Sequence, residues 1–449
     1  MGSKLQFVLR FACVAAAGGI LTACGQKNVE IPAQGSASPY LFVFAGDSDK
    51  QESDFLTMID VDPNSETRGQ PVSSVAIGHK NSMPHHMEYV PPPMGEPIFM
   101  NGHHHEMSLI VDPSNPESIA IERTFQPPPS LRYPHDYQRT PDGTRLVGFL
   151  RSEGASPDPS ETMEPAGHGG IAEYSIEGEL IRSVSAAVPE LEKAVRPYAF
   201  ALLPEQDRFM VTSAPMHESS WADVVQIYRY SDFTLLHTID LPVGRLDNGR
   251  ELEGSQAAGF GPRVLDDGSV FLNSYGCAFY HITDIATDAP KVSMVHALKT
   301  RAARSSDYIR GACGIPLQIG DYWVQPVGHL RRVVVLDISD PTAPREVFRL
   351  KTPRDFKPHW MAKDPLGNRL ILGAELGGEQ GFMMLRFDES NGNLAFDEDF
   401  NGKKKGLLFE RRHPGYISLL QASWPHGETG PAWGHAALFL GPDAELAQP

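Results

Sequence analysis

Apolar and polar residues alternate in short runs along most of the chain, and the runs recur in groups of four. One group reads His359-Trp-Met-Ala, Arg369-Leu-Ile-Leu-Gly, Gly381-Phe-Met-Met-Leu-Arg-Phe-Asp and Asn393-Leu-Ala-Phe, with the turn Asp364-Pro-Leu-Gly-Asn after the first run. Runs of this kind bounded by Pro, Gly, Asn and Asp predict β-strands, and long helical periodicity is nearly absent. The pattern therefore predicts an all-β chain built from units of four short strands.

The same unit recurs along the sequence. A second copy begins at His135 and continues through the turn Pro141-Asp-Gly. Further units begin near His85, Tyr198, Gln256 and Cys313. Repeated four-stranded units of this size are typical of a β-propeller, in which each unit forms one blade of a ring. Six complete blades are predicted in this way.

A seventh blade is split between the two ends of the sequence. Three of its strands are expected at Tyr40–Phe44, Phe55–Asp62 and Pro71–Ala76, and its inner strand at His435–Leu440. Pairing the ends in one blade closes the ring and removes exposed strand edges. The predicted fold is thus a seven-bladed β-propeller over residues 39–449, with the last blade closed by N- and C-terminal strands.

The first residues have the features of an export signal. Two basic residues precede the apolar run Phe11–Ile20, which is too short for a membrane-spanning helix. The sequence Leu21-Thr-Ala-Cys24 then resembles the lipobox of bacterial lipoproteins. The resemblance implies a signal peptide over residues 1–23, a lipid on Cys24, and a flexible tether over residues 24–38.

The expected location is the bacterial cell envelope, where the lipid on Cys24 holds the chain at the membrane. By resemblance to lipoprotein sorting rules, Gly25 after this cysteine favours the outer membrane, facing the periplasm. Removing the two positive charges of residues 1–23 takes the formal net charge from −17 to −19, because no acidic residue is lost. An acidic chain without basic runs argues against a nucleic-acid partner.

Cys277 and Cys313 are the cysteines that remain in the mature chain besides Cys24. An oxidising periplasm permits a disulfide between them, and two buried free thiols are the alternative. The sequence contains no CxxC motif, which disfavours thiolate zinc sites and thioredoxin-like chemistry.

Histidines are the clearest candidates for chemistry. In a propeller, the loop that enters each inner strand and the loop between the second and third strands lie on the same face. Thirteen of the 17 histidines fall in or beside such loops: His79, His85, His86, His103, His104, His105, His135, His168, His217, His329, His359, His426 and His435. Neutral imidazole is the commonest protein ligand for a transition metal. Structural histidines are the alternative, but in WD-type propellers they recur with a fixed Asp partner that this sequence lacks.

The histidines at the starts of inner strands are the predicted metal ligands: His85, His86, His135, His359 and His435, with His329 as a further candidate. A nitrogen-rich site without thiolates suits copper, zinc, nickel or iron(II), and an oxidising compartment favours copper, with zinc and iron as alternatives. Five or six ligands exceed a usual coordination shell with open positions, so one or two should orient the others. Glu88, Asp136 and Glu106 are predicted to orient ligand imidazoles. The run His103–His105 is expected to be a solvated turn with at most one ligand.

Six pieces of the sequence form a further pattern: His85-His86, the segment at His135, Arg196-Pro-Tyr-Ala-Phe, Gly328-His329, the stretch Asn391–Phe400 and Gly434-His435. As a set they resemble the selenium-binding protein / methanethiol oxidase family, over most of residues 40–440. The resemblance implies a seven-bladed propeller with a His-rich axial copper site. Members often carry cysteines soon after the His pair, whereas Met87-Glu-Tyr-Val-Pro-Pro-Pro follows in this sequence. This difference argues against selenium attachment through such a cysteine.

The predicted function is copper-dependent oxidation of a small thiol or sulfur compound with dioxygen, as the resemblance implies for a methanethiol oxidase-like enzyme. The sequence identifies no catalytic residue beyond the metal ligands. One alternative is a non-catalytic propeller that binds a protein or glycan partner at the envelope. Another is a metal-dependent hydrolase such as a lactonase. Propellers of that class usually hold a hard cation with carboxylate and amide oxygens, whereas the inner strands of this chain begin with imidazoles.

Overall fold

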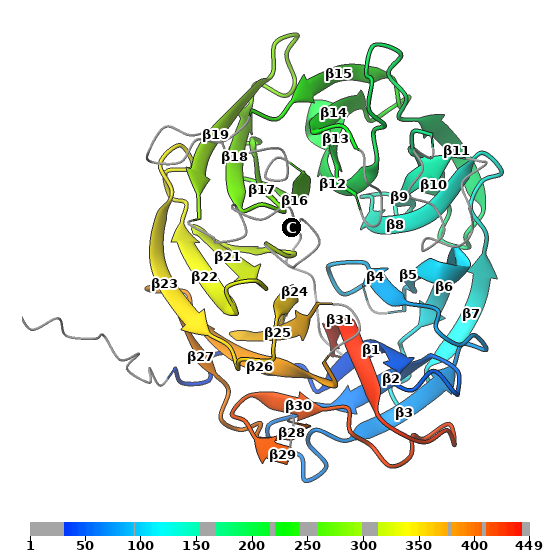
Figure 1. Ribbon diagram of the computed structural model, residues 1–449, viewed down its shortest axis with the longest axis vertical. Coiled ribbons are helices and arrows are strands. Elements are labelled where there is room, and N and C mark those ends of the chain that lie inside the picture. The colour runs from blue at the N-terminus through cyan, green and yellow to red at the C-terminus, as the bar shows by residue number, and fades with distance from the viewer. Residues whose placement is uncertain are drawn as a thin grey trace, which may run out of the picture.

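The computed structural model describes residues 31–93, 95–152, 167–215, 221–242, 258–298, 313–375, 379–405 and 410–441. In these residues the chain forms seven antiparallel sheets that stand around a central axis (Figure 1). The helical elements of this described part are two short 3-10 turns, η1 (His103–His105) and η2 (Pro204–Gln206). The predicted seven-bladed β-propeller is therefore confirmed.

Each blade has four strands, numbered below in order from the axis outwards. Blades 1 to 3 are β4 (Pro84–Met87), β5 (Ile98–Gly102), β6 (Met107–Asp112), β7 (Ala120–Phe125); β8 (Leu131–Arg139), β9 (Arg145–Ser152), β10 (Gly170–Tyr174), β11 (Leu180–Ser185); and β12 (Pro197–Leu203), β13 (Arg208–Ser213), β14 (Val224–Arg229), β15 (Leu235–Asp240). Blades 4 and 5 are β16 (Gly259–Val264), β17 (Val270–Ser274), β18 (Ala278–Thr283), β19 (Lys291–Ala297); and β20 (Leu317–Ile319), β21 (Tyr322–Val327), β22 (Arg332–Asp337), β23 (Arg345–Lys351). Blades 6 and 7 are β24 (Pro358–Lys363), β25 (Arg369–Ala374), β26 (Gly381–Asp388), β27 (Asn393–Phe396); and β31 (Ala432–Leu440), β1 (Tyr40–Asp47), β2 (Phe55–Asp60), β3 (Pro71–Ala76). Outside the blades, β30 (Tyr416–Ser418) adds to β26, and β28 (Lys403–Lys405) pairs with β29 (Glu410–Arg412).

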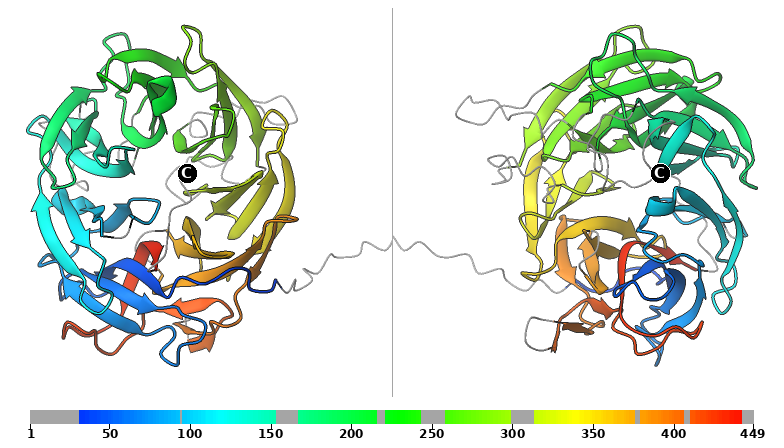
Figure 2. Two further views of the ribbon diagram at one scale, coloured as in Figure 1. Left: turned by 180° about the vertical axis from the view of Figure 1, so that it is seen from behind. Right: turned by 45° about the vertical axis from the view of Figure 1, so that its right-hand side comes forward.

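The seventh blade joins the N-terminal strands to the C-terminal strand in the order β3-β2-β1-β31. β1 and β31 are antiparallel, with Leu41 opposite Phe439 and Val43 opposite Ala437. All four side chains are fully buried. In Figure 2 the red β31 lies beside the blue β1. The predicted closure of the last blade by both ends of the propeller is confirmed.

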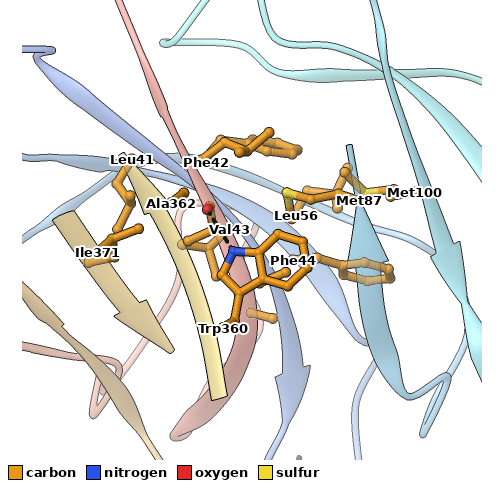
Figure 3. Close-up of a cluster of buried hydrophobic side chains, with 14 of the residues drawn as sticks. Leu41, Phe42, Val43, Phe44, Leu56, Met87, Met100, Trp360, Ala362 and Ile371 are labelled. Carbon is orange, nitrogen blue, oxygen red and sulfur yellow. Dashed lines mark hydrogen bonds between the residues drawn. The ribbon is translucent and has the colours of Figure 1, made fainter. Parts of the chain in front are cut away.

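A buried apolar cluster connects blades 6, 7 and 1 near the axis (Figure 3). At its centre Trp360 is fully buried and its indole Nε1 donates to Ala437 O at 3.2 Å. Val43, Ile371 and Met87 belong to the same cluster. Burying a side chain of this size stabilises the fold by about 1.5–3 kcal/mol. Trp360 and Met87 each come directly after a histidine, so this packing also fixes the strands that carry those histidines.

A disulfide joins Cys277 to Cys313 and thereby links blades 4 and 5. Cys277 lies in the turn between β17 and β18, and Cys313 lies just before β20. Two residues further on, Ile315 N donates to His359 O at 2.7 Å. The sequence left open whether these cysteines pair, and in the structure they do.

The segment before β1 is bound to blade 6 rather than flexible. The Asn368 amide bonds both Gln34 N and Pro32 O at 3.1 Å. Ser38 is fully buried, and its Oγ donates to the Asp364 carboxylate at 2.6 Å. The expected flexible tether is therefore wrong for residues 31–38, because the turn after β24 supplies hydrogen-bond partners for their backbone.

The predicted signal peptide, residues 1–23, and the predicted lipidation site, Cys24, lie outside the described residues. Within the described part, no helix has the length and apolar character needed to cross a membrane.

Candidate metal centre

Six histidine side chains meet in the interior of the ring. They come from blades 1, 2, 6 and 7: His85 and His86 on β4, His103 at the start of η1, His135 on β8, His359 on β24 and His435 on β31. None has more than 8% of its surface exposed. Each neutral imidazole carries one donor and one acceptor, so a buried group made of imidazoles must find partners for both kinds of nitrogen.

β-Bulges carry the histidines of the inner strands. In β8, Pro134 and Asp136 pair with Phe149 and Gly148, which are neighbours on β9, so His135 is an extra residue between them. The register shifts at the corresponding place in β4, β24 and β31. A bulged residue leaves the ladder and its side chain takes a new direction. In all four strands a Pro or Gly precedes the histidine, and these residues are enriched at bulges.

Two other inner strands have the same register shift with different side chains. Tyr198 of β12 and Phe260 of β16 occupy the bulged positions there. The ring centre of Tyr198 lies 3.9 Å from that of His135 and 4.3 Å from that of Phe260. The Phe260 ring lies 5.9 Å from the His359 ring. The axis is therefore lined by imidazoles on four blades and by larger aromatic rings on blades 3 and 4.

The imidazoles are close enough to share one ion. His85 Nε2 and His135 Nε2 are 3.1 Å apart. One nitrogen from each of His85, His86 and His435 lies within 4.8 Å of the others. Ligand nitrogens lie about 2.0–2.1 Å from a zinc-sized ion, so a separation of 3.1 Å corresponds to an angle at the metal of roughly 100°. The pair has the spacing of two ligands on one ion. Two ligands at this distance from an ion can be at most about 4.2 Å apart, so the trio, with nitrogens up to 4.8 Å apart, would have to move inwards to share one.

Hydrogen bonds assign the proton positions on two of these rings. His135 Nδ1 lies 2.9 Å from Tyr198 O, and His435 Nδ1 lies 3.0 Å from Ala374 O. A carbonyl oxygen only accepts, so both Nδ1 atoms carry the proton and both Nε2 atoms keep a lone pair. Anchoring of one ring nitrogen on a backbone carbonyl is the arrangement that holds metal-binding histidines in proteins.

The buried nitrogens without a hydrogen-bond partner among the described residues include His85 Nδ1, His86 Nε2 and His435 Nε2. A buried polar atom without a partner costs about 1–3 kcal/mol. A metal ion would satisfy those that carry a lone pair, as His435 Nε2 does, so the residues present fit a nitrogen-ligated transition metal. The donor set suits copper, zinc, nickel or iron(II).

Burial keeps these imidazoles neutral. Desolvation, followed by the neighbouring imidazoles, lowers the pKa of His85 and His86 well below the usual 6.5. Desolvation likewise lowers the pKa of His435 well below this value and that of His359 to about 4. The neutral form is the one that binds metals, so the cluster is ready to bind at neutral pH.

The structure brings together five of the six histidines predicted as ligands. His329 does not join them, since it lies half-buried in the turn between β21 and β22, and no ring contact or metal-binding group found in the described residues includes it. The run His103–His105 is predicted as a solvated turn with at most one ligand, and His103 is the member that lies at the axis. It is buried, and its ring lies 5.3 Å from that of His85, while His105 in the same turn is exposed.

Two of the three predicted orienting acids have other partners. The Glu88 carboxylate contacts Arg145 Nε at 2.8 Å and Arg139 Nη2 at 2.7 Å, and it accepts from Phe99 N at 3.0 Å. Glu106 pairs with Arg132 at 3.5 Å. The expectation that these acids orient imidazoles is therefore wrong, because arginines of blade 2 attract both carboxylates away from the axis.

Asp136, the third predicted orienting acid, makes no hydrogen bond to an imidazole within the described part of the chain. Its Oδ2 accepts from Phe200 N at 3.1 Å, and its Oδ1 has no hydrogen-bond partner among the described residues. The Tyr89 hydroxyl lies 3.4 Å from His86 Nδ1. No pattern in the sequence places Tyr89 at the axis. It lies past the end of β4, where strand alternation no longer decides which residue faces inwards.

No protein-family model and no curated protein matches the sequence. Solved structures do match. A hypothetical selenium-binding protein from Sulfolobus tokodaii is 14% identical with a TM-score of 0.63, and the match covers 91% of this chain and 94% of that one. A periplasmic gluconolactonase from Pseudomonas aeruginosa is 12% identical with a TM-score of 0.57, covering 84% and 97%. At these identities the likeness shows the fold. The protein is therefore a seven-bladed β-propeller whose distinguishing feature is a buried axial cluster of imidazoles.

Proposed function

We propose that the axial imidazoles hold one transition-metal ion, copper foremost, and that the protein oxidises a small thiol with dioxygen. The observation that carries the proposal is the buried, neutral group of His85, His86 and His435, with ligand nitrogens within 4.8 Å of one another. The sequence resemblance to the selenium-binding protein / methanethiol oxidase family supports the choice of copper. The fold is shared with the hypothetical selenium-binding protein from Sulfolobus tokodaii.

The site contains two kinds of residues: imidazoles that would bind the metal, and aromatic residues that pack beside them. His135 and His435 present Nε2 to the centre while backbone carbonyls hold their Nδ1–H groups. The rings of Tyr198 and Phe260 pack beside the imidazoles and are buried. In the proposal they form the apolar side of the site, next to the organic group on the thiol sulfur. Copper, when bound, supplies a redox-active Lewis acid at which a thiolate gives up electrons and dioxygen accepts them.

Metal content is the first test. The mature chain, purified without a histidine tag and offered copper, should carry about one copper per chain by mass spectrometry. A His85→Ala/His86→Ala double variant should carry almost none. His329→Ala is the matched control, because it removes a histidine outside the cluster, and it should keep its copper. Absence of metal from the wild type, or retention in the double variant, contradicts the proposal.

Oxygen uptake tests the reaction itself. Copper-loaded wild type should consume dioxygen in the presence of a small thiol such as methanethiol, and the double variant should not. Copper-loaded protein that consumes no dioxygen with any small thiol would exclude the oxidase and leave only the metal site.

Hydrolysis is the second candidate function. The fold resembles that of a periplasmic gluconolactonase, and the imidazole ligands also suit zinc, which activates water for hydrolysis. Lactone opening by zinc-loaded protein, lost in the same double variant, would favour this function over the oxidase.

The proposal includes a location at the bacterial envelope, with Cys24 lipidated. The Cys277–Cys313 disulfide supports an oxidising compartment, because structural disulfides are rare where thiols are kept reduced. Labelling with radioactive palmitate that disappears in Cys24→Ala is the expected result, and unlabelled wild type would exclude the anchor.

A further inference from the structure

A serine, a histidine and a carboxylate form a chain of hydrogen bonds at the rim of blade 7. Ser74 lies on β3, the outermost strand of this blade, and His426 and Glu428 lie between β30 and β31, where the chain passes beside β3 (Figure 1). Ser74 Oγ is 2.5 Å from His426 Nδ1, and His426 Nε2 is 3.1 Å from a carboxylate oxygen of Glu428. A nucleophile, a base within hydrogen-bond reach of it and a third group that orients the base are the parts of a nucleophilic site.

The hydrogen bonds assign the proton positions along this chain. A carboxylate only accepts, so in the neutral imidazole Glu428 holds the proton on His426 Nε2, and Nδ1 keeps its lone pair. The bond at Nδ1 is then donated by the Ser74 hydroxyl. His426 is therefore placed to take the Ser74 proton when the oxygen attacks, and the Glu428 carboxylate lies where it would stabilise the imidazolium that forms.

Packing holds the imidazole of His426 against β3. Its side chain is only 8% exposed, and its ring centre lies 4.8 Å from that of Phe55. Trp424 packs on the same phenyl ring, with centres 4.6 Å apart. The turn that carries the histidine is closed by Trp424 N, which donates to Glu428 O at 2.9 Å. The base is thus oriented before a substrate arrives.

The serine is within reach of small molecules, and its surroundings select among them. Ser74 is half-buried on an edge strand, whereas its neighbour Ser73 is buried. The Glu428 side chain is 27% exposed, and next to it Thr429 N donates to the Glu52 carboxylate at 2.6 Å. Two carboxylates at this place disfavour an anionic substrate. An uncharged acyl compound fits the site better.

We propose that Ser74, activated by His426 and with Glu428 as the positioning residue, hydrolyses small uncharged carboxylic esters at the rim of blade 7. Ser74 Oγ forms a bond to the acyl carbon while its proton passes to His426 Nδ1. The imidazolium gives this proton to the leaving alcohol as the ester C–O bond breaks, and Ser74 is left acylated. Water, which gives a proton to the same imidazole, then releases the carboxylic acid and restores the hydroxyl. The inference is independent of the axial metal.

Labelling with a fluorophosphonate probe tests the nucleophile directly, because the probe phosphonylates serines that a base activates. Mass spectrometry of the digested wild type should find the probe on Ser74. Ser339 is the internal control, since it is exposed and its Oγ donates to the Asp337 carboxylate without a histidine, and it should stay unlabelled. His426→Ala should react about 10²- to 10⁴-fold more slowly. Wild type without label on Ser74, or His426→Ala that reacts as fast as the wild type, would overturn the inference.

The role of Glu428 needs a readout that a purely structural role would not move. Glu428→Gln should lower the rate of phosphonylation at saturating probe, while the probe concentration that gives half of this rate and the melting temperature stay as in the wild type. A rate equal to that of the wild type, or a loss of stability without a change in this rate, would overturn the role of Glu428.

Ester hydrolysis separates this site from the axial one. The wild type should hydrolyse p-nitrophenyl acetate, and Ser74→Ala should lose this activity while melting as the wild type does. Treatment of the wild type with a chelator should leave the activity unchanged. Activity that persists in Ser74→Ala, or that disappears with the chelator, would assign the hydrolysis to another part of the molecule and overturn the inference.

Discussion

At the scale of the residue, the site depends on keeping several imidazoles neutral inside the protein. An imidazole exposed to water is close to half protonated near pH 6.5, and a protonated ring cannot bind a metal. Burial removes the water that would stabilise the charged form, and each neighbouring imidazole adds repulsion if it is charged as well. The lowered pKa values are thus a direct consequence of collecting the histidines at the axis.

The same pKa values predict how stability depends on pH. Because the folded pKa values of the four imidazoles lie below 6.5, with His359 at about 4, the unfolded chain binds more protons than the folded one between these limits. Stability from these groups is complete above pH 6.5 and is lost as the pH falls through this window. For His359, whose pKa is about 4, the loss is about 2 kcal/mol between roughly pH 6.5 and pH 5. Asp136, whose pKa burial raises to about 7, acts in the opposite direction but is a single group.

Urea unfolding of the metal-free protein measures this effect. The free energy of unfolding should fall by several kcal/mol from about pH 7.5 to pH 5, and by less in the His85→Ala/His86→Ala variant, which has fewer imidazoles to protonate. His329→Ala should keep the full dependence. Equal stability at both pH values in the wild type would show that the cluster is not held neutral.

Much of the candidate site could be predicted from single residues, and the failures have a common cause. The predicted histidines that follow Pro or Gly at the start of an inner strand reach the axis, because the bulge belongs to the strand itself. His329 and His103 both follow a second strand, yet only His103 turns inwards, since a loop's path depends on what it packs against. Glu88 forms an ion pair with Arg145 of another blade. Such a contact between distant parts of the chain cannot be predicted from a local sequence pattern.

At the scale of the element, the inner strands share one backbone irregularity but carry different side chains on it. Six of them shift register near their first residues, and the shift is a property of the blade rather than of the histidine. The residue placed on the bulge then decides what the axis contains: an imidazole on four blades, Tyr198 or Phe260 on two. Exchanging one residue on a bulge would therefore change the chemistry of the axis without changing the fold.

A covalent link lies beside β20, the shortest inner strand among the described residues. The Cys277–Cys313 disulfide closes a segment of 36 residues next to β20. A bond of this kind typically stabilises a protein by about 2–4 kcal/mol. Cys277→Ser/Cys313→Ser should lose about this much in urea unfolding and should also bind copper more weakly, because Ile315 N bonds the backbone of His359. A variant as stable as the wild type would mean that the disulfide contributes nothing to the ring.

At the scale of the whole molecule, the split blade decides whether the ring closes. β31 pairs with β1 and packs against β4, β24 and β25, so its removal opens an edge on β1 and exposes the apolar cluster around Trp360. The repeat in the sequence sufficed to predict this arrangement. Three strands are left over at the N-terminal end and one at the C-terminal end, and together they make the four strands of a blade. The partners of the apolar residues at this junction could not be predicted, because they depend on the register between β1 and β31.

Deleting residues 430–449 should abolish cooperative folding. The expected result is insoluble protein, or soluble protein without a sharp thermal transition, measured by circular dichroism. Deleting only residues 442–449 is the control, because it leaves β31 intact. A truncation at residue 430 that melts cooperatively would show that the ring tolerates an open seventh blade.

The position of His435 on the closing strand has a consequence for the order of events during synthesis. His85, His86 and His135 leave the ribosome early, but the trio with ligand atoms within 4.8 Å is complete only after β31 has been made and has paired with β1. A nascent chain with six finished blades therefore offers only part of the site. If the axial site holds the metal proposed above, capture of the ion would be the last step of maturation, because the trio is complete only in a chain that has folded to the end.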